Sequence, residues 1–408
     1  MRYLSVIIFM LAAVIAYAGD RSSLSAGITE MPEIGGMHIA KASDAVPDTT
    51  ALPEVKEEKK DLIQKIVGYF EESNKPKEDK KFDISFIGGP YYSSDTKFGV
   101  GLVAAGLYKT DYADSLLMPS DVSLYLKATS SMHFELGVRG NHIFPGDRMR
   151  MNYDVNFASI KSKFWGIGYD MNVNDNNESV YKYLKSQAHV KLLWRLADNF
   201  YVGPMLTFDY VNGRDFELPF LWNGEDDRTF NFGVGFTVQY DSRDFISNAY
   251  KGVCLKLDQR FNPHFMLNRY AFSLTSFDIS WYQRVWKGCT LAAQFTSRFT
   301  YGNTPWGLLS TLGGSDNMRG YFEGRYRDKC EMDVCLELRQ HVWRRNGVVA
   351  WIGAGTVFPR LKDIELREIL PNYGIGYRWE FKKRVNVRVD LGFGKHQRGF
   401  IFSINEAF

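Results

Sequence analysis

The chain has 408 residues, with 50 Lys and Arg against 47 Asp and Glu, so its formal net charge is only +3. This near balance gives no indication of a nucleic acid or another polyanion as a partner. Aromatic residues make up 15% of the chain. The mean hydropathy of −0.27 excludes little, because a barrel with a polar lumen averages to the same value as many other proteins.

The first eighteen residues are typical of a secretory signal peptide. Arg2 precedes an apolar run at 4–15, and Ala16-Tyr17-Ala18 is an A-x-A cleavage pattern. We therefore expect residues 1–18 to be removed from an exported protein. No later stretch approaches the roughly 18 continuous apolar residues that a membrane-spanning helix needs, so the sequence predicts no helical membrane protein.

Residues 19–81 differ from the rest of the chain. They begin as a linker rich in Ser, Gly, Pro and Asp, and then apolar residues recur at helical spacing between Lys and Glu. This pattern predicts one short amphipathic helix near residues 54–72. The helix could rest on a barrel rim or the membrane surface, or plug a lumen; its single apolar stripe favours a surface.

From residue 82 onward, apolar and polar residues alternate with a period of two, which is typical of strands with one face toward water. In 372–381 the odd positions are apolar or aromatic, and 385–394 repeats the pattern. We count sixteen such runs, each long enough for the roughly 9 to 11 residues of a tilted membrane strand. The sequence predicts an all-β fold, a 16-stranded antiparallel transmembrane β-barrel over 82–408. The runs are centred near residues 86, 103, 124, 136, 154, 188, 205, 235, 255, 276, 294, 336, 352, 376, 389 and 402.

The predicted connections alternate in length. Short turns fall near residues 197–199, 286–288, 344–346 and 382–384, and long connections fall at 160–180, 211–226, 302–330 and 359–370. Outer-membrane barrels have short periplasmic turns and longer extracellular loops. With both ends of the barrel in the periplasm, the 302–330 connection becomes the sixth extracellular loop.

That loop carries the sequence Leu312-Gly313-Gly314-Ser315-Asp316-Asn317-Met318-Arg319-Gly320-Tyr321. Gly313 and Gly314 allow backbone turns with positive φ, and Gly320 allows close approach to a wall. Arg319 offers a rigid fork of five donors that carboxylates can bind. We expect the loop to fold into the lumen.

Several of these segments resemble the BamA/TamA superfamily of outer-membrane barrels, also known as the bacterial surface antigen family. Met318-Arg319-Gly320-Tyr321 resembles the [VI]-R-G-[FY] motif of its sixth loop, and Glu337-Leu338-Arg339 is similar to its strand 12. The turn at 240–244 and the closing segment 388–408 also resemble the family. The resemblance covers most of residues 82–408 and implies that Phe408 is read as an assembly signal.

In that family the loop arginine binds carboxylates on strands 12 and 13, and the sequence departs from this pattern. The strand-13 motif F-x-D-x-G reads Trp351-Ile352-Gly353-Ala354-Gly355, so Gly353 replaces the aspartate. Glu337 is the first candidate partner for Arg319. Glu380 and Asp390 are the alternatives.

The resemblance implies a protein of the cell outer membrane that assists insertion or translocation of proteins or lipids there. Its partners would be outer-membrane lipid, unfolded outer-membrane proteins and an unidentified periplasmic protein. Residues 19–81 are too short for the periplasmic POTRA domains of active family members, so we expect a barrel-only relative. The alternative is a passive pore or structural barrel whose loop plugs the lumen.

Signals for an enzyme are weak. Ser315-Asp316-Asn317 and Ser94-Asp95-Thr96-Lys97 match motifs of penicillin-recognising enzymes, but they lie about 220 residues apart and no K-T-G accompanies them. The seven His residues form no metal-binding motif. We therefore expect no catalysis, no cofactor and no metal. We also expect free thiols at the four cysteines, among which only Cys254 and Cys335 could meet across a lumen.

Overall fold

The computed structural model describes residues 82–408 except 94–96, 114–116, 223, 247 and 383. The predicted signal peptide (1–18) and the predicted helix near 54–72 lie outside these residues. Within the described part of the chain, the helices are all too short or too polar to cross a membrane.

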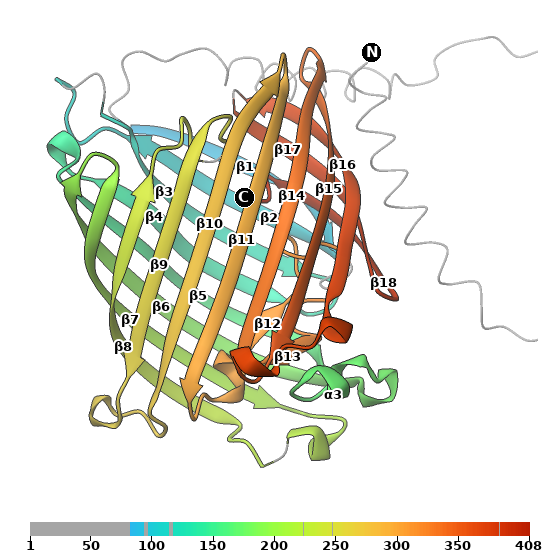
Figure 1. Cartoon of the computed structure of the whole chain (residues 1–408). Coiled ribbons are helices and arrows are strands. Elements are labelled where there is room, and N and C mark those ends of the chain that lie inside the picture. Colours follow the sequence, from blue (N-terminus) through green and yellow to red (C-terminus); the bar gives the residue numbers. More distant parts are fainter. Residues whose placement is uncertain (1–81, 94–96, 114–116, 223, 247, 383) are drawn as a thin grey trace, which may run out of the picture. The chain divides into compact units, whose positions relative to one another are not determined.

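Sixteen strands form one antiparallel sheet (Figure 1), which confirms the predicted all-β antiparallel fold. Every predicted strand centre lies inside a strand. The strands are β1 (Phe82–Ser93), β2 (Lys97–Tyr108), β3 (Ser120–Thr129), β4 (Phe134–Ile143), β5 (Met149–Phe164), β6 (Ser179–Ala197), β7 (Phe200–Arg214), β8 (Arg228–Asp241), β9 (Gly252–Asn262), β10 (Phe272–Trp286), β11 (Cys289–Gly302), β14 (Cys330–Trp343), β15 (Asn346–Phe358), β16 (Leu370–Lys382), β17 (Val385–Gly394) and β18 (Gln397–Ile404).

The sheet closes into a barrel through a short seam between β1 and β18. Among the described residues, the two strands meet at two residue pairs, Tyr92 with Phe402 and Ser93 with Ile401. By contrast, β1 pairs with β2 at twelve positions, and β17 pairs with β18 at eight. The seam is therefore much weaker in backbone pairing than the junctions on either side of it.

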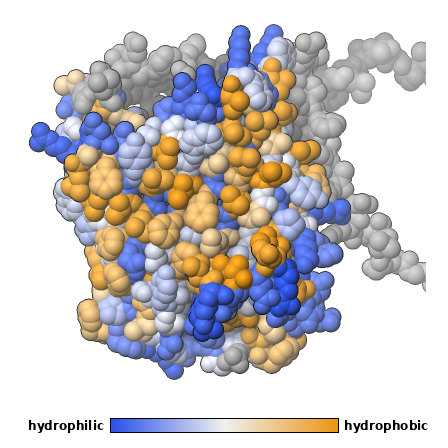
Figure 2. Space-filling model, in the orientation of Figure 1, coloured by the Kyte–Doolittle hydropathy of each residue, from blue (hydrophilic) through white to orange (hydrophobic). Residues whose placement is uncertain are grey.

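Side chains alternate between the outer surface and the lumen as the period of two requires. On β16, Tyr373 and Ile375 face outward and are 53% and 63% exposed, whereas the lumenal Asn372 and Arg378 are 3% and 4% exposed. Figure 2 shows apolar side chains spread over the outer face of the barrel. The chain thus places polar residues inside and apolar residues outside.

The connections differ in length between the two rims. One rim carries short turns, such as 287–288 and 344–345, and the other carries the longer loops. The short elements of the described residues are η1 (Pro145–Asp147), α3 (Tyr169–Val173), η2 (Asp175–Asn177), η3 (Pro219–Trp222), η4 (His264–Met266), η5 (Trp306–Leu308), β12 (Ser310–Leu312), β13 (Tyr326–Asp328), η6 (Leu361–Asp363) and η7 (Leu366–Glu368). An aromatic cluster that includes Phe164, Trp222 and Trp306 packs at the long-loop end.

The four cysteines, Cys254, Cys289, Cys330 and Cys335, are buried free thiols. Cys335 lies on the lumenal face of β14, close to the inward loop described below.

Candidate functional site: an arginine buried in the barrel lumen

The loop between β11 and β14 turns inward as the glycine pattern predicts. Its two short strands, β12 and β13, pair with each other, and the segment between them reaches the barrel wall. At Gly320, φ is +115°, and an added Cβ would lie 2.7 Å from the carbonyl carbon of Gly392 on β17. Only a residue without a side chain allows the loop backbone to approach the wall so closely.

An apolar cluster holds the base of the loop. Met318 and Tyr321 are 3% and 2% exposed and pack with Leu312 and with wall residues of β15 and β16. The Tyr321 hydroxyl donates to the carbonyl oxygen of Pro371 at 2.6 Å and accepts from the Lys395 amide at 2.7 Å. The tyrosine of the motif therefore fixes the loop to β16 and to the β17–β18 turn.

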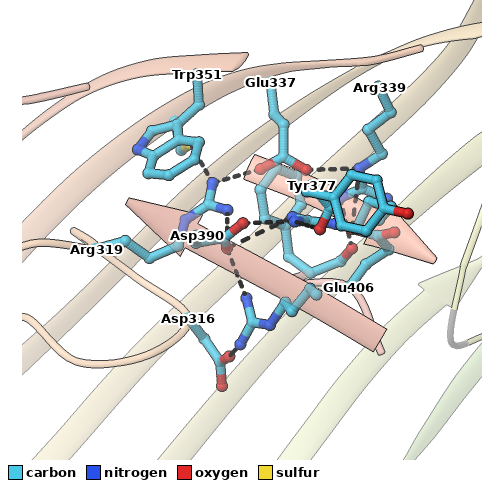
Figure 3. A network of polar contacts seen from close by, with 12 residues as sticks. Asp316, Arg319, Glu337, Arg339, Trp351, Tyr377, Asp390 and Glu406 are labelled. Carbon is cyan, nitrogen blue, oxygen red and sulfur yellow. Dashed lines mark hydrogen bonds and ion pairs between the residues drawn. The ribbon is translucent and has the colours of Figure 1, made fainter. Parts of the chain in front are cut away.

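Arg319 lies at the centre of the site, with 1% of its surface exposed. Its Nη1 donates to Asp390 Oδ2 at 2.9 Å, and its Nη2 donates to Glu337 Oε2. The guanidinium also stacks on Trp351, with its central carbon 3.7 Å from the ring centroid. Figure 3 shows the guanidinium enclosed by these three side chains.

The carboxylates that hold Arg319 are themselves held by further arginines. Glu337 Oε1 accepts from Arg339 Nε at 2.6 Å. Asp390 Oδ1 accepts from Arg378 Nη1. Both carboxylates are fully buried, so each needs more than one cation to offset the cost of desolvation. The result is a continuous network of alternating charge across β14, β16 and β17 (Figure 3).

A fourth arginine ties the loop to β17 at a second point. Arg388 is 1% exposed and donates to Asp316 Oδ1 at 2.5 Å. Asp316 belongs to the loop, three residues before Arg319. Two kinds of ion pair therefore join the loop to the wall. A loop arginine binds wall carboxylates, and a wall arginine binds a loop carboxylate.

Two of the three carboxylates that the sequence offered as partners for Arg319 do bind it in the structure. Glu337 and Asp390 both bind Arg319. Glu380 does not: it lies near the short-turn rim, where its carboxylate accepts from the backbone amide of Arg384. No acid replaces Gly353; instead the neighbouring lumenal residue, Trp351, provides a flat face for the guanidinium, and Asp390 on β17 supplies the second carboxylate.

The segment after β18 occupies the same part of the lumen, which the sequence did not indicate. Glu406 Oε2 accepts from Arg378 Nε at 2.7 Å. The Phe408 ring packs with Tyr282 and Cys335, and Arg339 donates to its main-chain oxygen at 2.9 Å.

Phe408 lies beyond the last strand of the barrel. The closing strand ends at Ile404, so Phe408 is not part of it and does not lie on the outer surface. Its aromatic ring packs with side chains of the barrel interior because Arg378 and Arg339 hold this segment inward. A role of Phe408 as an assembly signal concerns the unfolded chain and stays a prediction.

Sequence reasoning missed Trp351, Arg378, Arg388 and Glu406 as members of the site. The alternation of the strands could have identified two of them. Arg378 on β16 and Arg388 on β17 lie on the lumenal face, as Asp390 does. Buried carboxylates also require buried cations, so a search for arginines on that face would have found them.

The remaining lumen is a polar cavity of about 500 Å³ on the side of β3 to β11. Several of its charged side chains form ion pairs, such as Lys127 with Glu135 at 3.0 Å and Arg260 with Asp209 at 2.6 Å. Within the part of the chain that the structure describes, no group of three or more His, Cys, Asp or Glu side chains is placed to hold a metal ion.

The fold and site define an antiparallel barrel in which the sixth connection on the long-loop rim is locked inside by an arginine. The family model for the Omp85 superfamily domain matches residues 120–408. The chain therefore belongs to the Omp85 superfamily, in agreement with the resemblance of its loop motif. No curated protein sequence matched the chain.

Solved structures of the same fold include three similar proteins. BamA from Haemophilus ducreyi, lacking POTRA domains 1–3, is 12% identical with a TM-score of 0.53, over 80% of this chain and 71% of that chain. CdiB from Acinetobacter baumannii is 12% identical with a TM-score of 0.50, over 80% and 60%. CdiB from Escherichia coli is 9% identical with a TM-score of 0.50, over 84% and 70%. The chain thus spans less than two thirds of the A. baumannii protein, and these similarities support the fold.

Proposed function

We propose that the protein assists insertion or translocation of outer-membrane proteins by opening sideways at the β1–β18 seam. The observation that carries this proposal is the seam itself, which has two residue pairs. An unpaired strand edge is a template for another strand, and adding a strand is a common way to bind an extended chain. Membership of the Omp85 superfamily supports the outer membrane as the location.

The rest of β1 strengthens the argument. All twelve of its residues pair with β2, so the strand is firmly held on one side. On its other edge, only Tyr92 and Ser93 pair with described residues of β18. Pro90 lies within it and has no amide hydrogen to donate. A substrate strand would compete here with few native hydrogen bonds.

The segment that follows β18 contributes to the same geometry. It leaves the sheet at Asn405, where φ is +72°, and Glu406 is bound inside the barrel. While it is held there, it cannot extend β18 alongside the middle of β1. In this proposal the substrates are unfolded outer-membrane proteins, the environment is outer-membrane lipid, and the strand edges act without catalysis.

The proposal is tested by locking the seam with a disulfide. Tyr92 and Phe402 are directly paired, and paired Cα atoms in antiparallel strands are about 4.5–5.5 Å apart, which is within the span of a disulfide. The double variant Tyr92→Cys/Phe402→Cys would form the bond in an oxidising compartment. We expect the locked protein to fail to complement depletion of the wild type, and a reductant to restore function.

The matched control is Tyr373→Cys/Phe393→Cys, an aromatic pair across β16 and β17 with ring centroids 5.5 Å apart. That bond locks a junction that does not need to open, so it leaves function intact. Quantitative proteomics of the outer membrane gives the readout: many unrelated barrel proteins should fall together with the locked seam. Unchanged barrel levels on depletion would instead indicate a passive pore or structural barrel.

A further inference from the structure

Two neighbouring hairpins on the short-turn rim carry the same pattern of residues. The β10–β11 hairpin has Val285-Trp286-Lys287, and the β14–β15 hairpin has Val342-Trp343-Arg344. Their tips are joined, because the His341 amide donates to the carbonyl oxygen of Gly288 at 2.7 Å. The two patterns therefore lie side by side on adjacent hairpins.

The apolar residues of this pattern are unusually exposed. Trp286 and Trp343 are 54% and 49% exposed, and Val285 and Val342 are 49% and 60% exposed. Figure 2 shows hydrophilic side chains at projecting tips on this rim and apolar side chains just below them. Tryptophan in such a position is typical of the interface between the hydrocarbon core and the headgroups.

The cations at these tips are Lys287 and Arg344. None of the carboxylates in the described residues pairs with Lys287 or Arg344, and the Arg344 guanidinium stacks at 4.4 Å on Trp343. Two arginines elsewhere on the same rim do have acidic partners: Arg195 pairs with Asp198 at 2.5 Å, and Arg243 pairs with Asp241 at 2.8 Å.

We propose that these two hairpins form a binding surface for an anionic phospholipid of the membrane leaflet next to the short-turn rim. In outer-membrane barrels the short turns are periplasmic, so this leaflet is the inner one. Lys287 and Arg344 bind the phosphate, and Trp286 and Trp343 lie at the level of the headgroups. The near-neutral total charge of the chain hides this local excess of positive charge. The surface is independent of the proposed opening of the seam.

The combination of residues favours a lipid over an acidic protein. The valines and tryptophans lie within one or two positions of the cations, so one partner must contact apolar and basic groups at the edge of the apolar band. A lipid molecule presents a negative phosphate directly above hydrocarbon and fits both. Each basic residue near an anionic membrane surface contributes roughly 1 kcal/mol to attraction.

The test is native mass spectrometry of the purified full chain, incubated with phosphatidylglycerol or with zwitterionic phosphatidylethanolamine. We expect the wild type to retain phosphatidylglycerol preferentially. The double variant Lys287→Gln/Arg344→Gln should lose this preference by up to about thirty-fold, which is two contributions of roughly 1 kcal/mol each. The charge-retaining Lys287→Arg/Arg344→Lys should keep it.

The matched control is Arg214→Gln/Lys362→Gln, which removes two exposed cations from the long-loop rim and should leave the preference unchanged. Heat-modifiability on a gel verifies that each variant is folded. Equal retention of both lipids by the wild type would overturn the proposal. So would an unchanged preference in Lys287→Gln/Arg344→Gln, the result expected if these cations bind an acidic protein.

Discussion

At the scale of single residues, Arg319 is the position on which the lumenal site depends. It has two carboxylate partners and an aromatic face, and it is almost fully buried. Changing it to Ala leaves Glu337 and Asp390 with fewer cations and should lower the free energy of unfolding by about 3–5 kcal/mol, the usual cost of breaking a buried pair. The transition temperature on a heat-modifiability gel measures this loss.

Arg319→Lys provides the comparison. Lysine keeps the charge but has neither the fork that reaches two carboxylates at once nor the flat surface that stacks on Trp351, so its transition should lie between those of the wild type and Arg319→Ala. Lys362→Ala, an exposed residue on the long-loop rim, is the control. Equal transitions for all four proteins would show that the loop is not anchored through Arg319.

A second prediction concerns Gly353, where the family has an aspartate. Restoring the acid should destabilise this protein, because an added Cβ would lie 2.5 Å from the carbonyl oxygen of Val334 on the adjacent strand. Gly353→Asp should therefore lower the transition temperature even though it offers Arg319 another carboxylate. Gly353→Ala separates the steric effect from the charge; a more stable Gly353→Asp would contradict this account.

These residues show how far the sequence could predict the site. The alternation of each strand placed Glu337, Asp390 and Glu380 on the lumenal face. It does not tell how far along the barrel axis each side chain lies. Asp390 lies opposite Gly376, and Glu380 lies four residues farther along β16. Only the inward path of the loop, fixed where Gly320 meets Gly392, decides which carboxylates Arg319 reaches.

At the scale of elements, the segment at 405–408 holds the end of β18. Glu406 binds Arg378 and accepts from Asn386 at 2.6 Å. Glu406→Gln removes the charge that pairs with Arg378, so the segment should leave the lumen more often. Hydrogen exchange should then increase in β18 and at the seam. Ser403→Ala, on the lumenal face of β18 opposite Arg388, is the control. Unchanged exchange in Glu406→Gln would show that the segment is held by other contacts.

The β8–β9 loop is the second element with a testable link to another part of the rim. Arg384 of the β16–β17 turn donates to Asp244 at 2.8 Å and to the main-chain oxygen of Asn248 at 2.7 Å. Burial raises the pKa of Asp244, but hydrogen bonds from the Tyr250 amide and from Arg384 outweigh it and hold the pKa below its usual value.

A depressed pKa means that the ionised carboxylate stabilises the closed loop. This contribution is fully present above the unfolded pKa of about 3.9, and it is lost as the pH falls through the lower folded value. Hydrogen exchange in 242–251, corrected for intrinsic rates, should therefore increase below about pH 4. Asp244→Asn should show the open behaviour at neutral pH, and a wild type that stays protected at low pH would contradict the role of this pair.

The sixteen strands were predictable because each is long enough for its alternation to be unambiguous, as in β16, where Tyr373 and Ile375 face outward. The segment after Ile404 was not, because four residues cannot show a period. Its path depends on arginines of β14 and β16 that are distant in sequence. Local pattern therefore specified the wall of the barrel, and long-range charge pairing specified what fills it.

At the scale of the whole molecule, the strength of strand pairing varies around the barrel. β5 and β6 pair at sixteen positions, and β1 and β18 at two. Local opening follows the regions with the fewest contacts and backbone hydrogen bonds. Hydrogen exchange of the protein reconstituted in lipid should therefore be fastest in β1 and β18 and slowest in β5 and β6.

The locked variant Tyr92→Cys/Phe402→Cys tests whether opening of the seam causes this difference in hydrogen-exchange rates. If fast exchange arises from opening of the seam, the disulfide should slow exchange in β1 and β18 and leave β5 and β6 unchanged, and a reductant should reverse the effect. The Tyr373→Cys/Phe393→Cys control should not alter β1. Uniform protection around the barrel would mean that the short seam is as stable as the other junctions, and the barrel would then have no preferred point of entry for a substrate strand.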